Sequence, residues 1–336
     1  MRRNAPHIFS FYKEAVMERR ERIFRIGKTV LIGALVLVLA APVSKLAAKL
    51  FSDPRAAAFL VYLETGRVVR LDTEPLLPTQ TRPAEKETEP PARKISFLAQ
   101  EKSLIKLSNF TQHSPNVEEL LTSTLSWDLT AEGPAVLILH THATESYADI
   151  SGYRTEDADR NMLRVGQEMA KILEENGIGV IHDTTLHDQP SYNGSYSYAR
   201  RTIEAYLEKY PSIRMVLDVH RDALELSETE QLSTHARVDG QDSAQLMLVM
   251  GTNAGGLYHP AWQENLSVGL KIQALLERQY PGICRPLQLR TERFNQDLSA
   301  AGMIIEVGAA GDTLEKALVA AGAFARAIVT LARGTA

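Results

Sequence analysis

The chain has 336 residues, a net charge of −4 and 23% charged side chains. This length suits one large globular domain with smaller elements, because domains usually contain roughly 100 to 200 residues. The C-terminal two thirds has no basic patch interleaved with aromatic residues, so nothing indicates nucleic-acid binding. The single cysteine, Cys284, excludes an intramolecular disulfide and has no partner for a metal motif, so we interpret it as structural.

The first 51 residues have the pattern of a leader and a membrane anchor. Arginine and lysine crowd residues 1–28, and an uncharged apolar run then continues to Lys45. Because Lys45 and Lys49 can extend their charges to the interface, we predict a transmembrane helix over residues 29–51. A cleaved signal peptide is the alternative, but no convincing cleavage site follows the run. The positive flank predicts a single-pass protein of the cell membrane, with a cytoplasmic N-terminus and an extracytoplasmic remainder.

Residues 52–100 form the next predicted part, an extracytoplasmic linker region. Its segment 79–93 is rich in proline and charge and lacks apolar periodicity, which is typical of an extended, flexible tether. A short strand is conceivable at 58–63. We expect residues 101–334 to form the folded domain of the protein.

Strand and helix patterns alternate along this domain, which predicts an α/β fold with a mostly parallel, twisted sheet flanked by helices. The expected strands are 136–140, 178–182, 214–219, 245–250 and 303–307. The expected helices are 161–175, 198–209, 265–279 and 313–331, of which the first ends at a glycine and the next two end just before a proline.

The first of these strands ends in two histidines, His140 and His142, with Glu145 close behind. Strand alternation would direct both imidazoles to the same face. Imidazole and carboxylate are common zinc ligands, and a catalytic zinc usually keeps three protein ligands and one position for water. For any one of these histidines, a hydrogen-bonded side chain at a strand end is the simpler interpretation.

Two later strands carry polar residues that could join this group. The strand at 214–219 leads into His220, and the strand at 303–307 contains Glu306. In open parallel sheets, ligands bind outside the carboxyl ends of the strands, so these segments can converge there. A carboxylate inside an apolar run is costly to bury unless it is paired, coordinated or used. An ordinary hydrogen-bonded glutamate at a sheet edge is the alternative for Glu306.

Six short strings in the domain resemble the stage II sporulation protein P family of zinc-dependent cell-wall amidases and endopeptidases. Together they span most of residues 100–332 in the order expected for that family. The strings are HTHATESY at 140–147, HDTT at 182–185, PSYNGSY at 190–196, DVHRDA at 218–223, NQD at 295–297 and EVG at 306–308. The resemblance implies the fold of the N-acetylmuramoyl-L-alanine amidases.

The same resemblance implies a set of zinc ligands and a general base. Laid on the amidase pattern, His142, Glu145 and His220 become the ligands of Zn²⁺, and Glu306 becomes the base. His140 could replace His142. The ligand glutamate of the amidases lies further along the chain, so other carboxylates remain open for the second position, namely Glu156, Asp157 and Asp159.

Further residues complete the predicted site. Arg221 either supplements the charge at the oxyanion or pairs with Asp222 at the surface. We expect His182 and His187 to cap a loop or to pair at the surface rather than to bind metal. The predicted contacts with sugar or peptide are His140, Asn193, Tyr196 and Asn295.

The function implied by the resemblance is hydrolysis of peptidoglycan during spore engulfment. The bond would be the amide between N-acetylmuramic acid and L-alanine, and a second cut at peptide cross-links stays open. A lytic transglycosylase and a membrane scaffold would be the partners. The alternatives are a non-catalytic wall-binding module, which would not need Glu306, and a zinc hydrolase of another extracellular amide.

Overall fold

The computed structural model describes residues 97, 99–125, 127–224 and 230–334. The predicted leader, the anchor at 29–51 and the possible strand at 58–63 lie outside these residues. Within the described part of the chain, no helix combines the length and apolarity needed to cross a membrane.

The described residues form a seven-stranded sheet with the strand order β1-β8-β7-β9-β4-β2-β3. All neighbouring strands in it are parallel except β7 and β9, which are antiparallel. The strands are β1 (Leu107–Asn109), β2 (Pro134–Leu139), β3 (Gly179–His182), β4 (Met215–Asp222), β7 (Leu246–Met250), β8 (Leu287–Leu289) and β9 (Ala301–Ala309). A separate antiparallel pair consists of β5 (Ala236–Val238) and β6 (Gln241–Ser243).

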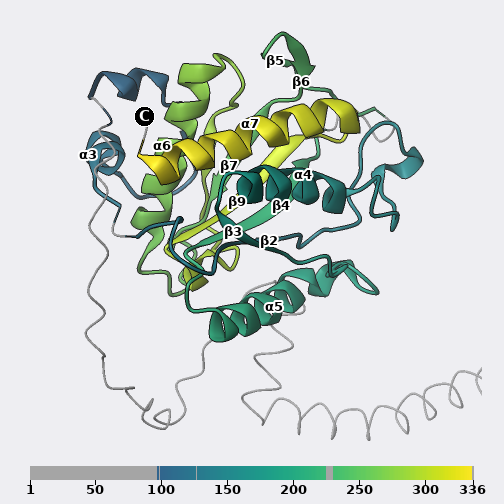
Figure 1. The fold of residues 1–336 in the computed structure, drawn as a ribbon, viewed down its shortest axis with the longest axis horizontal. Helices are drawn as coiled ribbons and strands as arrows, with labels where there is room; N and C mark the ends of the chain where they lie inside the picture. The colour runs from purple at the N-terminus through teal and green to yellow at the C-terminus, as the bar shows by residue number, and fades with distance from the viewer. Residues whose placement is uncertain (1–96, 98, 126, 225–229, 335–336) are drawn as a thin grey trace, which may run out of the picture. The chain divides into compact units, whose positions relative to one another are not determined.

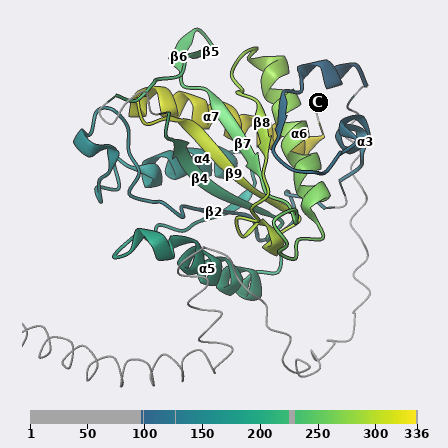
Figure 2. The ribbon, with the colours of Figure 1, turned by 180° about the vertical axis from the view of Figure 1, so that it is seen from behind.

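Helices pack on both faces of the sheet, as Figure 1 shows for α4 and α7 on one side and α5 on the other. The α-helices are α3 (Val117–Thr122), α4 (Met162–Glu175), α5 (Ser195–Lys209), α6 (Trp262–Gln279) and α7 (Leu314–Arg333). Short 3-10 turns are η1 (Ala99–Leu104), η2 (Ser151–Tyr153), η3 (Tyr192–Gly194) and η4 (Gln296–Leu298). Figure 2 shows α6 beside β8, at the other end of the sheet from β2.

The predicted mostly parallel α/β fold is confirmed, and each expected strand and helix is present with shifted ends. The strands at the centre are mainly apolar because both of their faces are buried, and the polar exceptions, such as His220 on β4 and Glu306 on β9, are residues of the predicted site. On β2, Val136 and Ile138 belong to the large core under α4, α6 and α7, whereas Leu137 and Leu139 pack against α5. The sequence patterns missed β1 and β8, which have three residues each.

The register of β9 positions one residue of the predicted site. Glu306 pairs with His220 on β4 and with Met247 on β7. Beyond this pair the register shifts, since Asp222 pairs with Ala309. The extra residue on β9 makes a bulge, a device that is common beside active sites. Gly308 lies there at φ +71°, where a Cβ would come within 2.9 Å of the Ala244 Cβ.

The predicted alternation after β2 is wrong. The strand ends at Leu139, and residues 141–144 form a turn that is closed by a hydrogen bond from the Glu145 N–H to the His142 carbonyl. Because the chain turns at this point, His140 and His142 do not share a strand face. The turn places His142 beside β4, while His140 remains beneath α4.

Candidate active site

The two histidines and the glutamate predicted as ligands lie together at the carboxyl ends of β2 and β4. The rings of His142 and His220 are 5.2 Å apart and nearly perpendicular. His220 Nδ1 lies 3.6 Å from Glu145 Oε2. All three side chains are buried, which is unusual for polar groups that are not paired or used.

Asp218 supports His220 from within β4. Its Oδ1 lies 2.9 Å from His220 Nε2. Its carboxylate also accepts hydrogen bonds from the N–H and the hydroxyl of Thr141. Burial raises the pKa of Asp218, but the opposing effects of His220 and Thr141 are larger and bring this pKa down to about 2. This carboxylate is therefore ionised and fixes the imidazole of His220 in place.

Charges in the cluster are coupled. Burial lowers the pKa of His220, but Asp218 and Glu145 more than offset this, and the pKa lies well above its usual value. Burial raises the pKa of Glu145, yet the His220 contact and Arg221 bring it below its usual value. Burial, followed by the nearby His220, lowers the pKa of His142 to about 4, so this imidazole is neutral and able to act as a ligand.

Glu306 faces this cluster from β9. Its Oε2 is buried and has no hydrogen-bond partner in the described part of the chain. Burial raises the pKa of Glu306 to about 8, with Glu145 and Asp222 adding to the increase and His220 opposing it. An unpaired buried carboxylate is expensive, and such groups occur mainly where they are used.

The donor set of this cluster fits a zinc ion. Buried atoms without a hydrogen-bond partner among the described residues include His142 Nδ1 as well as Glu306 Oε2. Two imidazoles and one carboxylate are the ligand types that zinc prefers, and Asp218 is placed to orient one of them. Among the described residues, however, no three His, Cys, Asp or Glu side chains form a ready-made metal centre. Zinc binding would therefore require these side chains to move closer together.

Arg221 does not pair with Asp222, so that alternative is wrong. Successive residues of a strand point to opposite faces, and Asp222 pairs instead with Arg285, at 2.7 Å. Arg221 is buried, and its guanidinium donates hydrogen bonds to the carbonyls of Ser146 and Tyr153. Arg221 therefore supports the loop that carries Glu145.

His140 also differs from its predicted role. Its side chain is fully buried, Nδ1 is hydrogen-bonded to the Val219 carbonyl, and Nε2 lies 3.0 Å from His182 Nε2. No part of the ring is exposed to a substrate, so substrate contact by His140 is not supported. His187 is buried rather than at the surface. Its two ring nitrogens are hydrogen-bonded to the His140 carbonyl and to the Thr202 hydroxyl.

The other predicted contact residues lie around the cluster. Tyr196, in the first turn of α5, has its ring 5.7 Å from that of His142. Asn295 is tied to this turn, since its Nδ2 donates to the Tyr196 carbonyl. Asn193 is exposed in η3. Glu145, rather than the exposed carboxylates of residues 156, 157 and 159, contacts the histidines.

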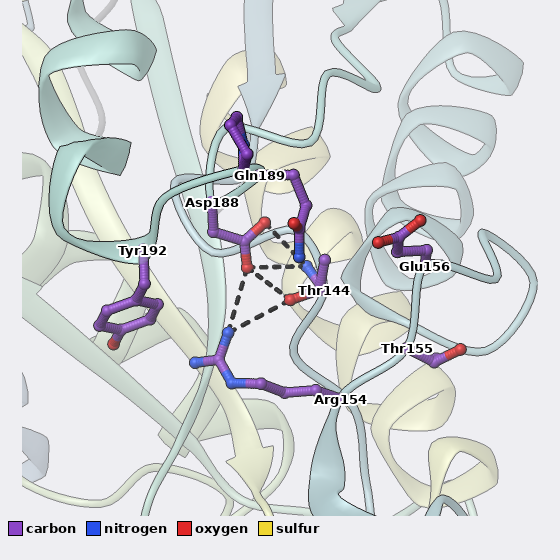
Figure 3. A pocket seen from close by; sticks show the side chains of 8 residues that line it. Thr144, Arg154, Thr155, Glu156, Asp188, Gln189 and Tyr192 are labelled. Atoms are coloured by element: carbon purple, nitrogen blue, oxygen red, sulfur yellow. Dashed lines mark hydrogen bonds and ion pairs between the residues drawn. The ribbon is translucent and has the colours of Figure 1, made fainter.

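A cavity of about 590 Å³ adjoins the cluster, and sequence reasoning missed its two central residues, Arg154 and Asp188. Figure 3 shows Arg154 reaching towards Asp188 and Thr144, with Tyr192 beside it. Tyr192 connects the cavity to the cluster, because its ring stacks on His142 at 4.2 Å. These side chains lie in loops, where no periodicity could reveal them. The only signals were that Thr144, Pro190 and Tyr192 lie inside the quoted strings and that Glu156 was an open candidate for the second ligand.

The fold and the site together define an α/β protein that gathers two histidines and two glutamates at the ends of its central strands. A family model for stage II sporulation protein P matches residues 63–329. The chain belongs to the stage II sporulation protein P family. It is 26% identical over 294 residues to stage II sporulation protein P of Bacillus subtilis (strain 168), covering 81% of this chain and 68% of that one.

Solved structures of N-acetylmuramoyl-L-alanine amidases are distant matches. AmiC2 of Nostoc punctiforme shares 15% identity at a TM-score of 0.35, covering 60% of this chain and 99% of that one. The Clostridium difficile 630 enzyme shares 13% sequence identity at a TM-score of 0.38, and the match covers 60% of this chain and 95% of that one. Ami1 of Mycobacterium smegmatis shares 12% sequence identity at a TM-score of 0.37, and the match covers 60% of this chain and 98% of that one. Scores this low carry no argument about the site.

Proposed function

We propose that this protein is a zinc-dependent peptidoglycan hydrolase of sporulation that cuts the amide between N-acetylmuramic acid and L-alanine. The observation that carries the proposal is the convergence of His142, Glu145 and His220 with the unpaired carboxylate of Glu306 among the described residues. Membership of the family supports the biological setting. Cleavage of peptide cross-links is an additional activity of the proposed site.

In this proposal His142, Glu145 and His220 hold the ion. When bound, zinc would lower the pKa of a water molecule and stabilise negative charge on the substrate carbonyl. Glu306 Oε2 accepts the proton of the attacking water. The same carboxyl then delivers that proton to the amine nitrogen as the carbon–nitrogen bond breaks, which leaves a free carboxylate and a free amine.

The protein's own charges suit this exchange. Burial raises the pKa of Glu306 to about 8, so a proton on it is stable enough to be held between the two transfers. The positive charge of the bound ion would favour the ionised form of Glu306 before the reaction. Asp218 keeps His220 oriented throughout.

The proposed location is the outer face of the cell membrane, with residues 29–51 as a single-pass anchor and residues 1–28 in the cytoplasm. The linker region would let the catalytic domain reach the wall. A lytic transglycosylase and a membrane scaffold are the proposed partners.

The test is digestion of purified peptidoglycan by the full-length protein, followed by mass analysis of the products. We expect free stem peptides that disappear on chelation and return when zinc is added. Intact peptidoglycan in the presence of zinc, also after digestion by a lytic transglycosylase, would contradict the proposal and favour a wall-binding module.

A further inference from the structure

The cavity beside the cluster contains the guanidinium of Arg154, of which only the Nη1 side makes close hydrogen bonds among the described residues. Arg154 Nη1 lies 3.2 Å from both Asp188 Oδ2 and Thr144 Oγ1. Its Nε has no hydrogen-bond partner in the described part of the chain, and Nη2 has only a loose ion pair with Glu145, at 3.7 Å. Figure 3 shows Nη1 aimed at Asp188 and the other two nitrogens directed away from it.

The engaged half of this guanidinium is held rigidly. Asp188 is fully buried and also accepts from the hydroxyl of Thr144 at 2.6 Å. Arg154 lies over the ring of Tyr192, with its Cζ 4.6 Å from the ring centroid. A backbone bridge joins Arg154 to Glu145. The side chain is nonetheless about 40% exposed, so its Nε and Nη2 edge is open to the cavity.

The chemistry of that edge points to a planar anion. Nε–H and Nη2–H are parallel donors, a geometry that matches the two oxygens of a carboxylate. The buried carboxylate of Asp188 already accepts hydrogen bonds from the N–H and the hydroxyl of Thr144 and from Arg154 Nη1. Glu156 is the remaining acidic group that lines the cavity, and it is exposed to solvent, where its repulsion is weak.

The position of the edge relates the anion to the reaction. The loose contact with Glu145 places the edge beside a proposed ligand, and Tyr192 stacks on the other, His142. A group held there would lie next to the proposed zinc ligands. A volume of about 590 Å³ suits a short peptide segment, since ligand cavities usually range from roughly 300 to 1,000 Å³.

We infer that Arg154 is a specificity residue that binds a carboxylate on the peptide part of the substrate, within the cavity next to the proposed zinc ligands. The inference rests on the proposed function. It adds that the enzyme distinguishes an acidic peptide from one whose carboxylate is replaced by a carboxamide.

The experiment compares two substrates that differ in one group. One is an N-acetylmuramoyl dipeptide whose second residue has a free α-carboxylate, and the other has a carboxamide there. With the full-length protein we expect kcat/KM to be about 10-fold or more higher for the carboxylate, mainly through a lower KM, because bonds between ions are the stronger kind. Arg154→Gln should abolish this preference, and Arg154→Lys should restore part of it.

A matched control separates recognition from damage to the fold. Arg160→Gln changes an exposed arginine of the same loop that does not line the cavity, and it should keep the preference. Loss of structure through Arg154→Gln would lower kcat/KM equally for both substrates. Loss of the paired Nε–H and Nη2–H donors alone would lower kcat/KM only for the substrate with the carboxylate. Equal losses, or equal kcat/KM values in the unmodified protein, would overturn the inference.

Binding distinguishes this inference from the proposed function. If neither dipeptide is cut, the Glu306→Gln variant is titrated with each dipeptide by calorimetry. Tighter binding of the carboxylate, lost on adding Arg154→Gln, would support the cavity assignment although the hydrolase proposal had failed. Equal affinities, or no binding, would refute the cavity assignment.

Discussion

At the scale of single residues, two substitutions can separate the roles proposed for Glu306, as general base, and for His220, as zinc ligand. Glu306→Gln keeps the size of the side chain and removes the proton acceptor, so we expect turnover of peptidoglycan to fall about 100-fold or more with zinc still bound. His220→Ala removes a ligand and should lose both zinc and activity. Turnover and zinc content per chain are the measurements.

Either assignment can fail independently. Activity that survives in Glu306→Gln would show that another group takes the proton. A full equivalent of zinc in His220→Ala would show that the ion binds elsewhere. Asn193→Ala, an exposed change in η3, serves as a control for zinc content because its side chain lies at the surface.

At the scale of elements, α4 depends on a glycine where it crosses the His140 and His182 pair. A Cβ on Gly166 would lie 2.5 Å from His140 Nε2 and 2.6 Å from His182 Nε2. Alanine usually stabilises a helix interior by about 1 kcal/mol over glycine, but here the clash should dominate and lower the melting temperature. Thermal unfolding followed by circular dichroism measures this.

The comparison position for Gly166→Ala is Gly322 in α7. A Cβ added at Gly322 would lie 3.3 Å from its nearest neighbour, the flexible end of Arg326, so Gly322→Ala should be neutral or stabilising. Equal effects of the two substitutions would mean that the histidine pair does not restrict α4.

A second prediction for the elements concerns Lys271, a fully buried lysine of α6. Its ammonium donates to the Leu120 carbonyl at the end of α3 and to the hydroxyls of Ser123 and Ser267. Such a cation at a helix C-terminus is favourable, so Lys271→Met should destabilise the fold by about 1–3 kcal/mol. The free energy of unfolding is read from denaturant titrations.

The stability of the wild-type protein relative to Lys271→Met should also depend on pH. Burial lowers the pKa of Lys271 to about 8, so above that pH the folded state binds fewer protons than the unfolded state. The sign of this linkage means that the wild-type protein gains stability relative to the variant between about pH 8 and about pH 10. A difference in the free energy of unfolding between the wild-type protein and Lys271→Met that stays constant across this pH range would contradict the shift.

At the scale of the whole molecule, the proposed anchor makes a prediction about fractionation. The full chain should sediment with membranes and resist washing with alkali, because roughly 20 apolar residues suffice to span a bilayer. A chain that lacks residues 1–51 should remain in the supernatant. Recovery of the full chain in the supernatant would contradict the anchor.

The sequence predicted the central strands and the main site residues for one physical reason. Apolar runs that end in His or contain Glu identify buried strands with polar ends, and parallel strands bring such ends together. The pattern singled out His140, His142, His220 and Glu306 in this way, and the family resemblance then favoured His142 over His140 as a ligand. The pattern could not find Arg154 or Asp188, whose positions depend on loop conformation. It misjudged His140 because one more residue of strand was assumed beyond Leu139.

The bulge at Gly308 divides β9 into two segments whose registers against β4 differ by one residue. An inserted residue between Gly302 and Glu306 would turn the carboxylate to the opposite face, since side chains alternate with a period of two. Removing Gly308 would instead shift only the chain that follows, which leads to Asp312 and α7, and would leave Glu306 in place. The half of the strand that carries Glu306 can therefore stay constant in length while the half that leads to the last helix varies independently.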